Sequence, residues 1–143
     1  MVSAHDVAAY ILKERGPLPA MKLHKLVYYS QAWSLVWDER PLFSEAVEAW
    51  AHGPVIPELY LRHRGIFELR EWPWGNPDAL DADGRDTVNA VLDYYGPQSA
   101  QWLSDLTHCE QPWLEARKGI PAGERGSSAI SLATMAEYYA SLP

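Results

Sequence analysis

Residues 48–60 constrain the fold of this chain more than any other stretch. They place an aromatic anchor at Trp50, a Gly53-Pro54 break and a second proline at Pro57 before an apolar pattern resumes. Proline fixes one backbone dihedral angle and lacks an N–H donor, and glycine tolerates conformations that other residues avoid. The stretch therefore fixes backbone geometry. It resembles no nucleophile motif, phosphate-binding loop or metal site.

The length and composition indicate one globular domain covering residues 1–143. The chain is 48% apolar and 22% charged, which is typical of a folded protein. Its seven tryptophans and eight tyrosines are many for 143 residues, so some are expected at an interface as well as in the core. The formal net charge of −7 disfavours direct binding to nucleic acid, whose phosphates would repel an acidic domain.

The sequence also predicts a cytoplasmic protein. Cys109 is the only cysteine, so an internal disulfide is impossible, which suits a reducing compartment. Residues 1–6 lack the basic and apolar regions of a signal peptide. No apolar run approaches the ~20 residues that span a bilayer, so we expect no membrane association.

Apolar periodicity and chain breakers predict a compact, mainly α fold (α+β) with about six or seven helices and a small β element. A first helix is expected to begin near a capping box formed by Ser3 and Asp6 and to end at Gly16-Pro17. A long central helix begins at Pro19 or Ala20. It has one apolar stripe, and its other face is expected to carry Lys22, Lys25, Tyr28, Tyr29 and Gln31.

The remaining elements are shorter. Residues 46–50 fit either a strand or a helical turn, and the pattern does not decide between them. Pro57 is expected to begin a helix that stops at Gly65, because proline is favoured in a first helical turn. An extended segment over 66–74 follows, with Phe67 and Leu69 on one side. Further predicted elements are helices over 81–95, 99–107, 112–116 and 134–142, a loop over 118–126 and an extended stub over 129–131.

Candidate catalytic groups are sparse. The histidines show no H-x-x-x-H or H-E-x-x-H spacing, and His108 and Cys109 are adjacent, which is poor spacing for chelation. A small hydrolase or metal-dependent enzyme using Cys109, His52, His63 and His108 remains an alternative. The favoured interpretation makes Cys109 a small core residue, and His52 and His108 hydrogen-bonded, half-buried structural groups.

Paired aromatic residues are the other signal. Neighbours on a helix point ~100° apart, so one member of each Tyr-Tyr pair is expected at the rim of the core. Trp72 and Trp74, in a segment broken by Pro73, are the tryptophans expected to be most exposed. Arg62 and Arg64 could pair with an acidic partner. The tyrosine pairs are Tyr28-Tyr29, Tyr94-Tyr95 and Tyr138-Tyr139.

Six stretches form one pattern along the chain: residues 6–12, 21–33, 42–45, 48–60, 104–108 and 111–113. In this order they resemble the Panacea domain, also called the SocA-like antitoxin domain. The Lys-Leu-x-Lys-Leu-x-Tyr-Tyr run and the Ala-Trp-x-x-Gly-Pro-Val block are specific together. His24 stands where a glutamine is common. The residues that carry the resemblance are Lys22, Leu23, Lys25, Leu26, Tyr28, Tyr29, Trp50, Gly53, Pro54, Val55, Pro57, Tyr60, His108, Pro112 and Trp113.

The resemblance implies a non-enzymatic antitoxin from a bacterial or prophage toxin–antitoxin system, with no cofactor. It would neutralise a cognate protein toxin by direct contact, and it could also act as an adaptor for an ATP-dependent protease. A DNA-binding autoregulator is a further alternative, which the acidic charge disfavours. The exposed members of six residues are the candidate partner-binding group: Tyr28, Tyr29, Arg62, Arg64, Trp72 and Trp74.

Overall fold

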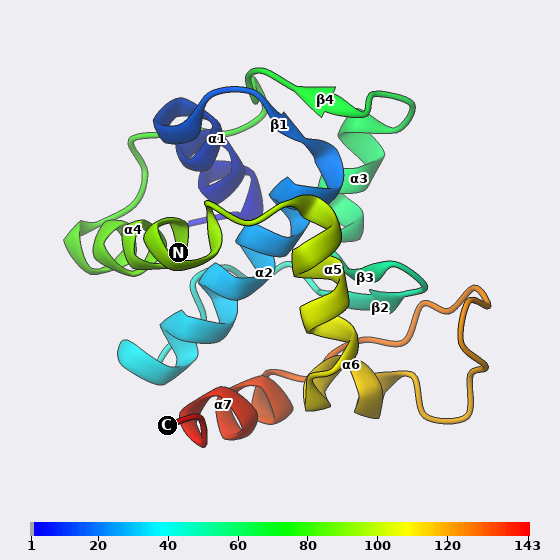
Figure 1. Ribbon diagram of the computed structural model, residues 1–143. Helices are drawn as coiled ribbons and strands as arrows, with labels where there is room; N and C mark the ends of the chain where they lie inside the picture. The colour runs from blue at the N-terminus through cyan, green and yellow to red at the C-terminus, as the bar shows by residue number, and fades with distance from the viewer. Residues whose placement is uncertain (1) are drawn as a thin grey trace.

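The computed structural model describes residues 2–143, which form seven helices and two small antiparallel strand pairs (Figure 1). The predicted mainly α architecture is confirmed. In chain order the elements are α1 (Ala4–Arg15), β1 (Leu18–Pro19), α2 (Ala20–Trp37), β2 (Glu48–Trp50), β3 (Gly53–Val55), α3 (Pro57–His63), β4 (Glu68–Leu69), α4 (Ala82–Tyr95), α5 (Ala100–His108), α6 (Gln111–Ala116) and α7 (Leu132–Ala140).

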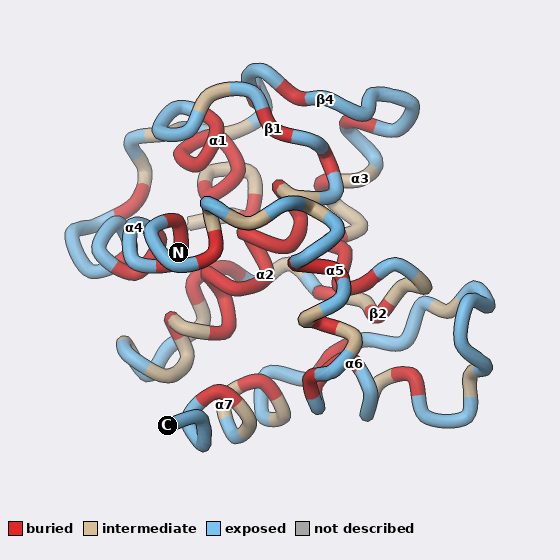
Figure 2. Tube along the Cα trace, viewed as in Figure 1, coloured by how far each residue is buried: buried red, intermediate tan, exposed pale blue. Residues whose placement is uncertain are grey.

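Helix α2 lies at the centre, with α1, α4, α5, α7 and β3 packed around it (Figure 1). Every residue from 23 to 32 is buried (Figure 2). The expected polar face is therefore wrong for Lys25, Tyr28, Tyr29 and Gln31. A helix surrounded on all sides has no solvent face, so its polar groups find internal partners. The Gln31 side chain, for example, accepts from the backbone N–H of Leu42 and donates to the carbonyl of Phe43.

Local signals set most helix ends. The predicted capping box is present: the Ser3 side chain accepts from the Asp6 backbone N–H, and the Asp6 carboxylate accepts from the Ser3 N–H. Gly16, with φ of 74°, ends α1. Pro57 occupies the first turn of α3, as the sequence predicts.

The strands form two separate pairs. β1 pairs with β4, aligning Leu18 with Leu69, and β2 pairs with β3, aligning Trp50 with Gly53. The undecided segment 46–50 thus ends in a strand. The expected extended stub at 129–131 adds an isolated bridge from Ala129 to the free edge of β2. The extended segment expected over 66–74 shrinks to a two-residue strand followed by turns.

No helix among the described residues is long and apolar enough to cross a membrane.

Candidate partner-binding surface

The loop over residues 72–76 is fixed to the first turn of α1. The Trp72 indole N–H donates to His5 Nδ1 at 3.1 Å, and the Asn76 backbone N–H donates to the Asp6 carboxylate at 2.8 Å. Gly75 approaches so closely that a Cβ there would lie 2.0 Å from the His5 carbonyl oxygen. Three contacts within five residues give this irregular loop a defined position.

That position separates the two tryptophans. Trp72 is buried at 4% exposure, whereas Trp74 is 45% exposed, and the two rings meet edge to face at 5.0 Å. The expectation that Trp72 is exposed is wrong, because its indole N–H finds a partner on α1 and its ring packs inward. Trp74 remains on the surface, supported from below by Trp72.

Polar contacts join this loop to α3. Because Trp72 donates to His5 Nδ1, the imidazole proton lies on Nε2, which donates to the Glu58 carboxylate at 3.2 Å. Glu58 also lies 4.0 Å from the Arg62 guanidinium. The structure therefore brings Arg62, Trp72 and Trp74 into one region, with His5 and Glu58 as the connecting residues.

A buried histidine pair lies beneath this region. The backbone N–H of Ile56 donates to His24 Nδ1, so the His24 proton lies on Nε2 and donates to His63 Nε2 at 2.7 Å. The His63 ring in turn packs edge to face against Trp72. Burial lowers the pKa of both histidines, and their mutual repulsion when charged lowers the pKa of His24 further. The pair is a neutral structural support.

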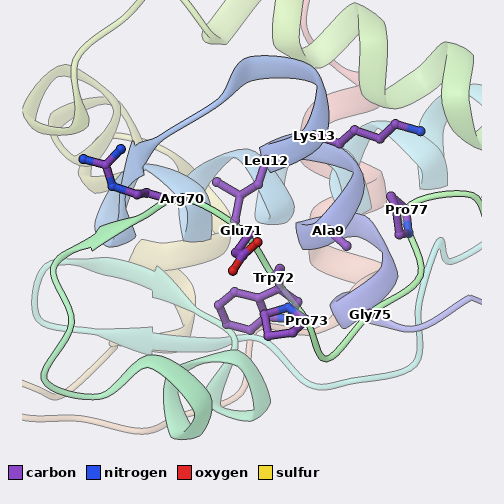
Figure 3. Close-up of a pocket in the computed structure, with 9 residues that line it drawn as sticks. All are labelled: Ala9, Leu12, Lys13, Arg70, Glu71, Trp72, Pro73, Gly75 and Pro77. Carbon is purple, nitrogen blue, oxygen red and sulfur yellow. The ribbon is translucent and has the colours of Figure 1, made fainter.

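A shallow cavity of about 320 Å³ lies between α1 and the segment 70–77 (Figure 3). Ala9, Leu12 and Trp72 contribute apolar lining. The Lys13 and Arg70 side chains extend to opposite sides in Figure 3. The cavity thus combines an apolar lining with charged edges.

The arginine candidates are on the surface. Arg62 and Arg64 are both exposed at the end of α3. Among residues 2–143, Arg64 makes no ion pair, and Arg62 has only its distant approach to Glu58. Both guanidinium groups are available to a partner.

Tyr28 and Tyr29 are not part of this surface. They are 1% and 0% exposed, so the expectation that one of them reaches the rim is wrong. The Tyr29 and Tyr139 hydroxyls both donate to the Glu110 carboxylate, at 2.7 and 2.8 Å, and Tyr28 bonds to Tyr139. Burial raises the pKa of the Glu110 carboxyl and of all three tyrosines. The cluster joins α2, α7 and Glu110, the residue preceding α6, inside the core.

The β2–β3 hairpin is held through its backbone. Four successive carbonyls, from residues 49 to 52, each accept a hydrogen bond from a side chain that follows β3 in the chain. The donors, in order, are Arg117, Trp113, His108 and Ser104. This ladder of contacts explains why the aromatic and polar residues of α5 and α6 accompany the Gly-Pro block in the sequence.

Lys25 fills the space under the hairpin. Its side chain is fully buried and its Nζ has no hydrogen-bond partner among the described residues. A Cβ at residue 53 would lie 2.5 Å from Lys25 Cε, and Gly53 also has φ of 123°. Two independent constraints therefore require glycine at this position. Burial lowers the Lys25 pKa to about 7.

The family model of the Antitoxin SocA-like, Panacea domain matches residues 23–114. The chain belongs to this family. The match begins within α2, includes the β2–β3 hairpin and α3 to α5, and ends within α6. No curated protein and no solved structure gives a significant match. Family membership supports an antitoxin role in general, implies a toxin as partner and suggests a non-enzymatic protein.

In this Panacea domain, the residues of the enzymatic alternative either have structural partners or are exposed. His108 donates to a backbone carbonyl and packs on Trp113, and His63 is held by His24. Cys109 is exposed, which contradicts its expected place in the core, and His52 is exposed rather than half-buried. Within residues 2–143, no group of three or more His, Cys, Asp or Glu side chains is placed to hold a metal ion.

Sequence reasoning missed two parts of this region. His5 and Glu58 lie 53 residues apart, and nothing local in the sequence indicates that their side chains meet. Phe67 was expected to share one side with Leu69, yet Leu69 is buried and Phe67 is 84% exposed. The run Arg-Gly-Ile-Phe at residues 64–67 places apolar residues after the basic end of a helix, and this pattern could have indicated an exposed Phe67.

Proposed function

We propose that this Panacea domain is the antitoxin of a bacterial or prophage toxin–antitoxin pair and acts in the cytoplasm by binding its cognate toxin directly. The family match over residues 23–114 is the observation that carries the proposal. We also propose that the functional domain extends over residues 1–143, because α1 and α7 lie outside the matched range and pack on α2.

The proposed mechanism is occlusion of the toxin or restraint of its active conformation. The surface around Trp74 supports this mechanism because its backbone is fixed by the contacts with α1. A preorganised contact loses little conformational freedom on binding and therefore binds more tightly. The charged and aromatic groups of the surface are suited to recognition, with no step of bond chemistry required.

Arg62, Arg64 and Trp74 are the proposed contact residues. All three are exposed, and tryptophan and arginine are enriched among residues that dominate binding energy. Arg62 approaches Glu58, which bonds to His5, the partner of Trp72 beneath Trp74. Arg62 and Trp74 thus stand on one supported region, and Arg64 is exposed two residues after Arg62 at the end of α3. Tyr28, Tyr29 and Trp72 are excluded from the proposal by their burial.

The test is co-expression with the neighbouring gene. We expect induction of that gene alone to stop growth, and co-expression of this chain to restore it. The Trp74→Ala variant and the Arg62→Ala/Arg64→Ala double variant should neutralise less well at equal protein levels. Truncation at a binding hot spot costs ~2 kcal/mol or more. Failure of the wild-type chain to restore growth would reject the antitoxin role.

Delivery of the toxin to an ATP-dependent protease is a further proposal, motivated by the sequence resemblance. It predicts that the toxin's half-life in cells becomes shorter when this chain is present. If the half-life is unchanged while growth is restored, inhibition occurs by binding alone and the adaptor role is rejected.

A further inference from the structure

The last turn of α3 and the turn that joins it to β4 together expose an unusual amount of apolar surface. Phe67 is 84% exposed, Leu61 61% and Ile66 52%, all within seven residues. The turn lies at the edge of the molecule, and its tube is almost continuously exposed (Figures 1 and 2). Scattered exposed apolar residues are ordinary, but a local group of this kind marks an interaction site.

The backbone of this turn is ordered by hydrogen bonds. The Ala20 N–H at the start of α2 donates to the Phe67 carbonyl at 2.8 Å, and the Ile66 N–H donates to the His63 carbonyl at 2.7 Å. Directly after Phe67, β4 pairs with β1. The exposed Phe67 side chain therefore projects from an ordered backbone, since hydrogen bonds hold the chain at Phe67 and on both sides of it.

The charge of this turn is opposite to that of the chain. Residues 61–70 contain three arginines and one glutamate, in a protein whose net charge is −7. Arg64 and Arg70 make no ion pair among the described residues. The apolar tip is thus bordered by guanidinium groups with free donors, which favour carboxylates.

We propose that this apolar tip, formed by Leu61, Ile66 and Phe67, inserts into an apolar pocket of the partner protein, and that carboxylates at the pocket rim pair with Arg62, Arg64 and Arg70. The inference rests on the proposed function, which makes the partner the toxin. It adds the chemistry of the toxin surface that is recognised: a pocket large enough for a phenyl ring, edged by Asp or Glu.

Charge favours such a protein over the two other candidates for binding the apolar tip, a second copy of this chain and an anionic lipid surface. A second copy docking the same turn in a symmetric contact would bring its own Arg62 and Arg64 against the first pair, and like charges at an interface are unfavourable. An anionic lipid surface would attract the turn but repel the rest of a chain with net charge −7. A protein pocket with an acidic rim is complementary to both the apolar residues and the arginines of the turn.

The experiment measures the affinity of the full chain for the purified product of the neighbouring gene by calorimetry. Phe67→Ala is expected to weaken binding about 30-fold or more, as at an aromatic hot spot. The Arg62→Glu/Arg64→Glu double variant should weaken it at least about tenfold and remove most of its salt dependence. These side chains are exposed, so melting temperatures should stay close to that of the wild-type chain.

Matched controls are available elsewhere on the surface. Tyr94→Ala removes an aromatic ring that is 69% exposed on α4, and Arg125→Glu reverses an exposed charge in the loop after α6. Both should leave the affinity within about twofold of the wild-type value.

Three results would overturn the inference. If the wild-type chain binds and neutralises the toxin while Phe67→Ala binds equally well, the tip is not the contact and the antitoxin role stands. If Phe67→Ala instead abolishes self-association in light scattering, or binding to anionic vesicles, the occupant is a second copy or a lipid surface. If the wild-type chain neither binds nor neutralises the toxin, the proposed function fails together with the inference.

Discussion

At the scale of single residues, the buried amine of Lys25 is energetically unfavourable in its charged form. An amine taken out of water without a hydrogen-bond partner resists protonation, and burial lowers its pKa from the ordinary 10.5 to about 7. Between these two values the unfolded chain carries a proton that the folded chain lacks. The free energy of unfolding should therefore increase as the pH rises from about 7 towards 10.

Replacing Lys25 with methionine removes the titrating group and keeps most of the side-chain volume. We expect Lys25→Met to stabilise the protein by about 1–3 kcal/mol near pH 7, because an apolar group replaces an unpaired polar one. The difference from wild type should shrink by up to about 1.4 kcal/mol per pH unit towards pH 9.5. Urea unfolding at pH 7, 8 and 9 measures both effects. Parallel pH profiles for the wild-type and variant proteins would contradict the explanation, and the exposed Lys118→Met serves as the control.

Residue-level burial was only partly predictable from the sequence. Tyr94 is exposed beside buried Tyr95, and Tyr138 is more exposed than Tyr139, as expected for helix neighbours that point ~100° apart. Tyr28 and Tyr29 are both buried, contrary to this expectation, because their helix is enclosed on all sides. The partners that satisfy a buried polar group, such as Glu110 for the Tyr29 hydroxyl, lie far along the chain and leave no local signal.

At the scale of secondary structure, a buried carboxyl group helps to hold α7 on the core, in addition to the packing of α7 on α2 and α6. Tyr139 of α7 and Tyr29 of α2 both donate to Glu110, so this side chain joins the last helix to the centre of the fold. Burial raises the Glu110 pKa, which means that the charged form is disfavoured in this position.

A comparison of two substitutions at Glu110 tests this role. Gln keeps the carbonyl acceptor and removes the charge, so Glu110→Gln should remain within about 1 kcal/mol of wild type. Glu110→Ala leaves two buried hydroxyls without their acceptor and should cost about 2–4 kcal/mol. Thermal unfolding gives the stabilities, and hydrogen exchange of the α7 amides shows whether that helix loosens first. Equal stability of the Gln and Ala variants would show that the hydroxyl bonds contribute little.

Most helices were predictable because residues within one turn of each end determine where the helix begins or stops. Ser3 and Asp6 begin α1, and Pro57 begins α3, each through chemistry within one helical turn. The segment 72–74 was not predictable in the same way. A turn at Pro73 and a hydrogen bond to His5, 67 residues away, decide that Trp72 faces inward and Trp74 outward. The candidate surface was therefore located only in part from the sequence.

At the scale of the whole molecule, stability should fall in mild acid. Burial lowers the pKa of both His24 and His63 below the ordinary 6.5. As the pH falls through 6.5, the unfolded chain takes up protons at these positions and the folded chain does not. The free energy of unfolding therefore decreases below about pH 6.5.

His24→Gln should reduce this acid sensitivity. A glutamine can accept from the Ile56 N–H and donate to His63 Nε2, so it can replace both hydrogen bonds without titrating. Chemical unfolding at pH 7, 6 and 5 should show a shallower decrease than wild type, by up to about 1.4 kcal/mol per pH unit. The exposed His52→Gln is the control and should follow the wild-type profile. An unchanged slope for His24→Gln would assign the acid sensitivity to other groups.

The hairpin contacts have a consequence for how such domains diverge. Residues 49–52 are recognised by Ser104, His108, Trp113 and Arg117 through carbonyl oxygens, which every amino acid supplies. The exposed side chain at position 52 can therefore be exchanged with little effect on the fold. The four donors lack this freedom, because each must place a particular N–H or O–H group at one oxygen. Mutational tolerance around the hairpin is thus asymmetric: the exposed turn position 52 can change, whereas Gly53 and the four donor side chains are constrained.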